Sequence, residues 1–221
     1  MIISHSHKFI FIKIPKTAGT SIVNHLEPHL NQEFRDLDLG DHEPLSLDYT
    51  GSNKEQTITS ILKKNNINID NYFQFSFTRN PWDLRLSRYF YLRDVEIAYN
   101  TDRNLRTDSS ALTLDFKSWC LNSGWFPSRN WGPKNKIQGG QIGFLQNDNF
   151  EINTDYIGKF ENLQEDFDTI CDKIGIPRQE LPHKNKSRHK HYTEYYDEET
   201  KQIVAEKYAK DIEYFRYKFG E

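Results

Sequence analysis

A short segment near the start of the chain combines a lysine, a glycine and several hydroxyl side chains directly after an apolar run. In order, its residues are Ile14, Pro15, Lys16, Thr17, Ala18, Gly19, Thr20 and Ser21. A strand that passes through a glycine-containing loop into a helix presents backbone N–H groups and the positive end of the helix dipole to an anion. Lys16 adds an ammonium, and Thr17, Thr20 and Ser21 add hydroxyl donors. The segment therefore predicts a phosphate-binding loop.

Loops of this kind also bind nucleoside triphosphates in kinases and NTPases. The pattern of those proteins is a glycine, four residues, and then Gly-Lys followed by Ser or Thr. In this chain Lys16 precedes the glycine, and the four positions before it are Ile12, Lys13, Ile14 and Pro15. The triphosphate pattern is not met, so a small-molecule kinase or other nucleotide-binding protein remains only as the alternative.

A second candidate anion site follows the alternating run over 73–78. Arg79 comes directly after that run, and Ser87 lies eight residues later. Asn80 is a good N-cap and Pro81 a good first helical residue, so a helix is predicted to start here. Eight residues are about two helical turns, which places Ser87 on the same face of the helix as its N-cap. The guanidinium of Arg79 offers a planar fork for a phosphate.

Together the two segments resemble the donor site of PAPS-dependent carbohydrate sulfotransferases, especially the branch that includes heparan and uronyl 2-O-sulfotransferases. PAPS is 3′-phosphoadenosine-5′-phosphosulfate, and PAP is its product. The resemblance implies that Lys16 and its loop bind the 5′-phosphosulfate, with Lys16 steadying the leaving bridging oxygen. It implies that Arg79 and Ser87 bind the 3′-phosphate. The resemblance extends to 157–163 and to the C-terminal helix, and the chain looks like a short form without the membrane anchor of the animal enzymes.

A basic loop is predicted over 181–191. Taken residue by residue, a solvated loop explains it as well as a binding site does. The resemblance implies that this loop covers the cofactor, with contacts from Lys186, Ser187 and Arg188. Its histidines raise the possibility of a metal site, but no acidic or cysteine partner sits at ligand spacing nearby, and we expect no metal.

A base is needed opposite the leaving phosphate, because sulfuryl transfer to a hydroxyl is an in-line displacement at sulfur. Gly40-Asp41-His42-Glu43 lies between the two donor segments. Similar enzymes carry a Gly-x-His element with the base at this place, so His42 is the predicted base, with Glu43 and Asp41 as alternatives. A surface histidine is the competing interpretation.

Aromatic and cationic residues gather in a loop-rich stretch that is a candidate acceptor site. They are Trp119, Trp125, Phe126 and Trp131, together with Arg129, Lys134 and Lys136. Aromatic faces and cations suit a sugar, particularly an acidic one. Local core packing explains Trp119 equally well.

The elements that must position these groups are readable from local patterns. Strands are predicted over 8–14, 73–78 and 155–160. Helices are predicted after Thr20 or Ser21 as a cap, from Pro81 to about Arg93, over 57–65 and 112–121, after a capping box of Asn162 and Glu165, and after Asp197. Segments 31–53, 94–111 and 122–150 are expected to be mostly irregular. Gly175 is expected to stop the helix after Asn162, and the inward row of the last helix is Val204, Tyr208, Ile212, Phe215 and Phe219.

Composition sets the outer limits. The 221 residues carry a net charge of −3, which argues against a general binder of nucleic acid or membrane surfaces. The two cysteines form no motif, and Cys171 sits in an apolar helical row, which favours a buried thiol. No apolar run approaches the roughly 18 to 20 residues that span a bilayer. The N-terminus lacks the pattern of a signal peptide, so a soluble cytoplasmic protein is expected.

We therefore expect a single α/β domain over 1–221 with a mostly parallel central sheet flanked by helices, in a P-loop-like topology. The cofactor is expected at the carboxyl edge of the strands. The expected activity is PAPS-dependent O-sulfation of a hydroxyl-bearing acceptor, such as a glycan.

Overall fold

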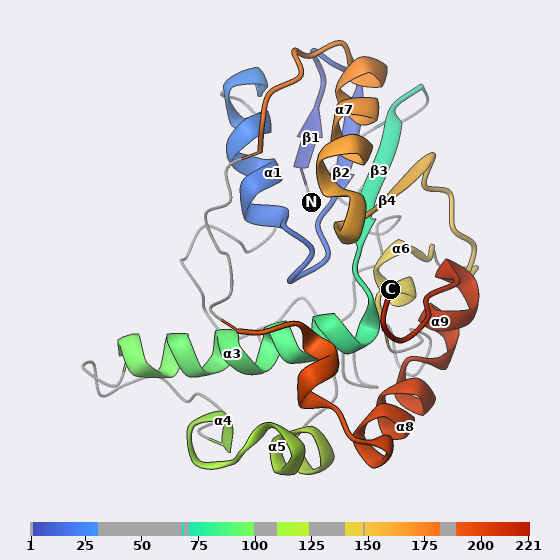
Figure 1. Cartoon of the computed structure of the whole chain (residues 1–221). Helices are drawn as coiled ribbons and strands as arrows, with labels where there is room; N and C mark the ends of the chain where they lie inside the picture. Colours follow the sequence, from blue (N-terminus) through green and yellow to red (C-terminus); the bar gives the residue numbers. More distant parts are fainter. Residues whose placement is uncertain are drawn as a thin grey trace.

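The centre of the computed structural model is a sheet in the strand order β1-β2-β3-β4 (Figure 1). The structure describes residues 2–30, 68, 71–99, 110–123, 140–147, 149–181 and 189–221, with side chains left out for 95–99. In these ranges β2 (Phe9–Ile12), β3 (Phe73–Thr78) and β4 (Tyr156–Lys159) run parallel, and β1 (Ile2–Ser4) pairs antiparallel with β2. The expected α/β domain with a mostly parallel sheet is confirmed.

The three parallel strands lie within the predicted runs, whereas β1 was not predicted. A strand of three residues is too short to show a period. It is joined to β2 by a turn in which Lys8 has a φ of 52°. β1 and β3 pair with the two edges of β2, and hydrophobic clusters pack on both faces of the sheet, so all four residues of β2 are buried.

Helices surround the sheet and continue beyond its lower end in Figure 1. In the described ranges they are α1 (Gly19–Leu26), α3 (Pro81–Tyr99), α4 (Ser110–Thr113), α5 (Phe116–Asn122), α6 (Ile142–Leu145), α7 (Leu163–Ile174), α8 (Glu198–Lys207) and α9 (Ala209–Phe215), with 3-10 turns η1 (Glu27–His29), η3 (Phe160–Asn162) and η4 (Tyr192–Tyr195). None of these helices is long and apolar enough to cross a membrane.

Two predicted helix limits are wrong. α1 begins at Gly19 after Ala18, so neither Thr20 nor Ser21 is its cap. α3 continues past Arg93 to Tyr99, into the segment expected to be a loop. No glycine or proline interrupts 94–99, and charged residues there are compatible with an exposed helix.

Other limits follow from local capping. The predicted helix over 112–121 is two helices, because the side chain of Asp115 accepts a hydrogen bond from the Ser118 N–H and starts α5 afresh. The capping box at Asn162 is not formed, since the chain enters α7 through the 3-10 turn η3. Gly175 ends α7 with a φ of 69°, as predicted.

The C-terminal helix begins as predicted, with Asp197 as its cap. Asp197 caps α8 and forms a capping box with Thr200. The helix then breaks at Tyr208, which separates α8 from α9. The predicted inward row is partly confirmed, because Val204, Tyr208 and Phe215 are buried, whereas Ile212 and Phe219 are half-buried. The predictions for 31–53, 57–65 and 124–139 lie outside the described residues.

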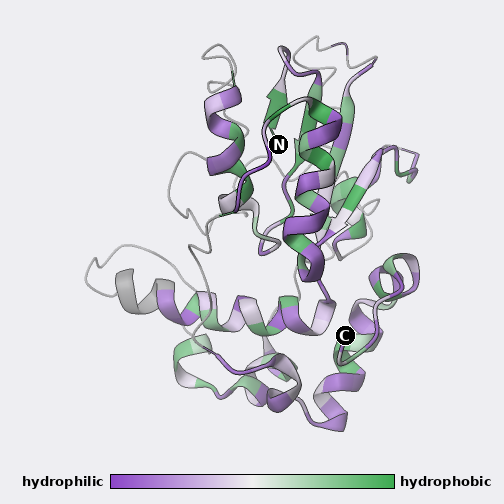
Figure 2. Cartoon of the chain, turned by 45° about the horizontal axis from the view of Figure 1, so that its top comes forward, coloured by the Kyte–Doolittle hydropathy of each residue, from purple (hydrophilic) through white to green (hydrophobic). Residues whose placement is uncertain are grey.

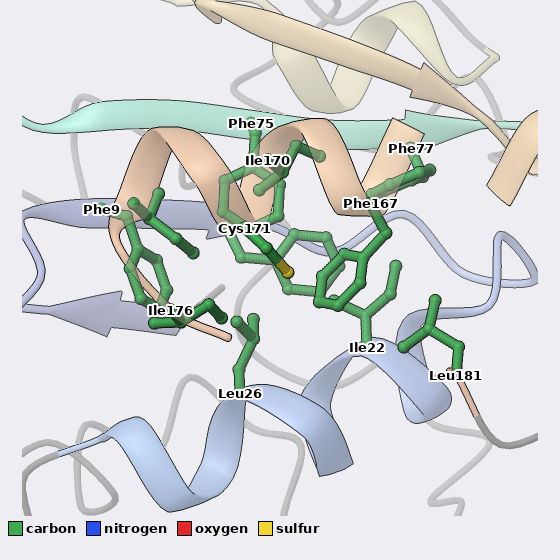
Figure 3. Close-up of a cluster of buried hydrophobic side chains, with 12 residues drawn as sticks. Phe9, Ile22, Leu26, Phe75, Phe77, Phe167, Ile170, Cys171, Ile176 and Leu181 are labelled. Atoms are coloured by element: carbon green, nitrogen blue, oxygen red, sulfur yellow. The ribbon is translucent and has the colours of Figure 1, made fainter. Parts of the chain in front are cut away.

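Alternate residues of β2 supply the two faces of the sheet. Phe9 and Phe11 join the cluster under α1 and α7, which Figure 3 shows with Phe167 and Cys171 of α7 packed against Ile22 of α1. Ile10, Ile12 and Ile14 face the other way and pack with residues from α6 and the segment after α9. Both cysteines, Cys120 and Cys171, are buried and free.

A further cluster joins α3, α5 and α8 below the sheet. It includes Trp82, Leu86, Trp119 and Val204. Figure 2 shows the corresponding distribution, with hydrophobic colour concentrated on the strands and hydrophilic colour on the outer turns of the helices. The start of α3 is thus packed on its neighbours, which fixes the direction of the helix that carries Ser87.

Candidate functional site

The predicted phosphate loop connects the end of β2 to the start of α1. Lys16 and Ala18 both adopt left-handed backbone conformations, with φ of 70° and 63°. The hydroxyl of buried Thr17 donates to the Ile14 carbonyl at 2.8 Å, so it braces the loop from inside. Left-handed residues in a turn direct neighbouring N–H groups into a concave anion site.

The start of α1 adds its own donors to this loop. The first bond at this end runs from the Ile22 N–H to the Ala18 carbonyl at 3.2 Å. The amides of the first turn therefore have no acceptor within the helix, and Ala18, the N-cap residue, has no side-chain oxygen to accept from them. A Cβ at Gly19 would lie 2.8 Å from Cγ of Lys13, so glycine leaves room for the Lys13 stem to cross the helix start.

Lys16 lies in a strongly cationic environment. Its Nζ is 3.9 Å from the centre of the Tyr91 ring on α3. Burial, and then the positive charges of Arg79 and Arg88, lower the pKa of Lys16 to about 8, against a smaller opposing effect of Asp94. Cations that converge on one place repel one another, and an anion bound between them relieves that repulsion.

Arg79 is buried and held by several partners at its guanidinium. Its Nε donates to Asp83 at 2.7 Å, and one terminal nitrogen donates to Ser87 Oγ at 2.9 Å and to the Lys16 carbonyl at 3.1 Å. The ring of Phe160 stacks on the guanidinium at 3.9 Å. The structure thus brings together Arg79, Ser87 and the phosphate loop, which the sequence separates widely.

Several residues around this site were not predicted. Arg88 and Tyr91 follow Ser87 on α3 and face Lys16. The spacing of Tyr91 from Ser87 was a usable signal, because residues four apart share a helix face, whereas Arg88 directly follows Ser87 and carried no such signal. Gln141 binds the main chain of Arg79, and Glu161 accepts from the Asn80 N–H at 2.6 Å. No sequence signal pointed to Gln141.

Other predicted site residues lie outside the described residues. These are His42 with Asp41 and Glu43, the contacts Lys186, Ser187 and Arg188, and the acceptor candidates between 125 and 136. Trp119 is described: it is buried under the guanidinium of Arg85, which favours the core-packing interpretation. Within the described ranges, no cluster of His, Cys, Asp or Glu is placed to hold a metal.

Comparison with known proteins identifies the family of the chain. A family model described as the sulfotransferase family matches residues 1–218. The chain belongs to the sulfotransferase family. Its members are PAPS-dependent transferases, so the kinase alternative is set aside.

The relatives found add little detail. A protein of Archaeoglobus fulgidus, described as uncharacterized, is similar to this sulfotransferase, with 27% identity over 110 residues. The alignment covers 50% of this chain and 73% of that protein. No solved structure matches.

The residues present fit the donor of a sulfotransferase. PAPS carries anionic groups at two separate places, its 5′-phosphosulfate and its 3′-phosphate. The phosphate loop supplies the amides at the start of α1 and the ammonium of Lys16 for one anion. Arg79 and Ser87 lie together at the neighbouring place and offer a guanidinium and a hydroxyl for the other. The donor set contains cations and N–H or O–H donors, which is the chemistry that phosphate oxygens require.

Proposed function

We propose that this sulfotransferase moves a sulfuryl group from PAPS to a hydroxyl of a carbohydrate acceptor, as the heparan and uronyl 2-O-sulfotransferase branch does. The contact of Arg79 with both Ser87 and the Lys16 carbonyl carries the proposal. It ties two candidate anion sites into one rigid unit. A nucleoside triphosphate would not need the second of these sites.

Each group of the donor site has a distinct task in this proposal. The loop from Pro15 to Ser21 binds the 5′-phosphosulfate through its amides. The Thr17 hydroxyl stabilises the shape of the loop through its hydrogen bond to the Ile14 carbonyl. The ammonium of Lys16 offsets the negative charge that develops on the departing bridging oxygen. Bound PAPS supplies an activated sulfuryl group, which is attacked in line by the acceptor oxygen. The ammonium of Lys16 is at the end of a long, flexible side chain. It can therefore move away from the Tyr91 ring toward the bridging oxygen on which the negative charge develops.

The 3′-phosphate is assigned to Arg79 and Ser87. Their side chains are already in contact, so little ordering is needed when the ligand binds. Lys186, Ser187 and Arg188 are proposed to cover the nucleotide from the basic loop. No metal is required, because cations and helix N–H groups supply the charge stabilisation.

The acceptor side of the proposal rests on the sequence. His42 is proposed as the base that takes the acceptor proton, with Asp41 and Glu43 as alternatives. The aromatic and cationic residues between 125 and 136 are proposed to hold a sugar, preferably an acidic one.

The cofactor proposal is tested by titration calorimetry of PAP, 5′-AMP and ATP against the wild-type protein and two variants. We expect PAP to bind most tightly. Arg79→Ala should weaken the binding of PAP by about 100-fold and the binding of 5′-AMP by less than about threefold, because a charge-assisted contact to the 3′-phosphate is lost. Arg178→Ala removes an exposed arginine from an ion pair with Asp172 and serves as the matched control. Equal affinities of wild-type protein for PAP and 5′-AMP would refute the proposal.

The catalytic proposal is tested with radiolabelled PAPS on an array of glycans. His42→Ala should abolish sulfation while PAP affinity stays at the wild-type level. Sulfation that persists in this variant would move the base to another residue, which Asp41→Asn and Glu43→Gln would then identify.

A further inference from the structure

The side chain of Gln141 brackets the main chain of Arg79. Its Oε1 accepts the Arg79 N–H at 2.8 Å, and its Nε2 donates to the Arg79 carbonyl at 2.7 Å. Gln141 is fully buried, 62 residues further along the chain. One primary amide thus satisfies both polar groups of one peptide residue, as a neighbouring strand would.

Arg79 needs such a partner because of its place in the fold. The ladder between β3 and β4 ends at the pair Thr78 and Lys159. The first bond of α3 runs from the Leu84 N–H to the Asn80 carbonyl, so the carbonyl of Arg79 takes no part in it. Arg79 therefore lies between a ladder and a helix, and its buried N–H and C=O require other partners.

Asp211 of α9 holds Gln141 in turn. Its Oδ2 accepts the Gln141 N–H at 2.7 Å, and its Oδ1 accepts the Ile142 N–H at 2.9 Å. Asp211 is fully buried. Gly140 has a φ of 104°, and a Cβ there would lie 2.6 Å from Asp211 Oδ1, so residues 140–142 wrap closely around the carboxylate.

We propose that Gln141 and Asp211 are positioning residues of the donor site, acting through the main chain of Arg79. The guanidinium is fixed by Asp83 and Ser87 at one end, and the Cα position is fixed by Gln141 at the other. The arginine is therefore preset for the 3′-phosphate before a ligand arrives. This inference rests on the proposed function, which assigns that phosphate to Arg79.

A purely structural role is the competing explanation. A buried glutamine that merely completes the core would, when replaced, loosen the fold and weaken every ligand in similar proportion. A positioning role changes the preference for PAP over 5′-AMP, since only the 3′-phosphate contacts Arg79. The ratio of the two dissociation constants therefore separates the two roles.

Gln146 provides a matched control at the opposite end of the same short helix, where it is the C-cap of α6 as Gln141 is the N-cap. It is also buried, it follows Leu145 at the end of α6, and its Nε2 donates to the Phe150 carbonyl at 3.2 Å. Gln141→Leu and Gln146→Leu remove the same amide and add the same side chain. Only the first change releases Arg79.

The experiment measures PAP and 5′-AMP affinity by calorimetry, and the thermal midpoint, for both leucine variants. In Gln141→Leu we expect PAP to bind about tenfold more weakly and the affinity for 5′-AMP to change by less than about twofold. A tenfold loss is about the net contribution of one hydrogen bond. Gln146→Leu should leave both affinities unchanged even where its thermal midpoint falls. Asp211→Asn should shift the ratio in the same direction as Gln141→Leu, because one of its two acceptor oxygens is lost.

Gln141→Glu keeps the acceptor for the Arg79 N–H and removes the donor to its carbonyl. It is the second variant should Gln141→Leu fail to fold, and it should also lower the preference for PAP. A wild-type preference that disappears in Arg79→Ala but persists fully in the Gln141 variants overturns the inference and leaves the proposed function standing. Absence of any preference in the wild-type protein overturns the proposed function itself.

Discussion

Lys16 shows how catalytic need and folding stability oppose each other at a single residue. The ammonium sits near Arg79 and Arg88 and is largely removed from water. Folding therefore disfavours the charge that the proposed chemistry requires. An anionic ligand removes this conflict by pairing with the cations, which is the physical reason to expect tight donor binding.

Lys16→Met should raise stability while abolishing activity. The folded pKa of Lys16, about 8, is below the ordinary 10.5. The free-energy cost of keeping Lys16 protonated in the folded state is thus fully present below pH 8 and disappears between pH 8 and 10.5. We expect the variant to gain about 1 kcal/mol at pH 7, after allowance for solvent screening, and to lose at least about 100-fold in sulfation.

Urea denaturation at pH 7 and pH 10 checks the first part, and a radiolabel assay checks the second. The gain in stability should shrink at pH 10. A variant less stable than the wild-type protein at pH 7 would show that the contact with Tyr91 outweighs the repulsion.

Among elements, those with strong local signals were predicted and those set by distant contacts were not. β3 alternates apolar and polar residues and ends at Thr78, directly before Arg79, and α3 begins at Pro81 after the cap Asn80. Each of these features depends on neighbours in the sequence. β1 depends instead on pairing with β2, and the left-handed Ala18 that replaces the expected cap depends on the shape of the whole loop.

The candidate site divides in the same way. Arg79 and Ser87 could be paired from sequence because helical geometry relates residues eight apart. Gln141 and Asp211 could not, because their link crosses 70 residues and involves main-chain groups, which every residue carries. Polar side chains that bind backbone leave no pattern in a single sequence.

α9 leads to a prediction of pH dependence through Asp211. Burial raises the pKa of this carboxyl to about 6, against the ordinary 3.8. The folded state therefore takes up the proton first, and the stability contributed by this group grows as the pH falls from about 6 to about 4. Asp211→Asn lacks this contribution. As the pH falls through that range, the free energy of unfolding of the wild-type protein should therefore rise relative to that of the variant by up to about 1.4 kcal/mol per pH unit.

Urea denaturation of both proteins between pH 4 and pH 7 measures the effect. Asp172→Asn is the contrasting variant: Arg178 lowers the pKa of Asp172 below 3.8, so its contribution is lost only below about pH 4, and the difference from the wild-type protein should not grow between pH 7 and pH 4. A difference between wild type and Asp211→Asn that is independent of pH would contradict the prediction.

At the scale of the whole molecule, Asn80 joins three distant parts of the chain. Its Oδ1 accepts the Trp82 N–H at 3.2 Å and caps α3. Its Nδ2 donates to the Lys218 carbonyl at 2.8 Å, and its own N–H donates to Glu161 at 2.6 Å. The helix start beside the donor site, the turn after β4 and the C-terminal segment therefore meet at one fully buried residue.

Asn80→Asp and Asn80→Ala distinguish capping from this joining role. Aspartate keeps the cap but loses the donor to Lys218, and it places a charge beside backbone carbonyls. We expect each variant to lose about 2 kcal/mol of unfolding free energy, with aspartate no better than alanine. Urea denaturation at pH 7 measures this. If Asn80→Asp matches the wild-type protein, the cap alone accounts for the residue.

The bracket that Gln141 and Asp211 place on Arg79 also bears on how the protein is made. A nascent chain that has left the ribosome through residue 180 already contains the phosphate loop, Arg79, Ser87 and the whole sheet. It still lacks α9, whose Asp211 holds Gln141 against the arginine. The donor site would therefore mature after the sheet has formed, and nucleotide binding would begin only once α9 has been synthesised.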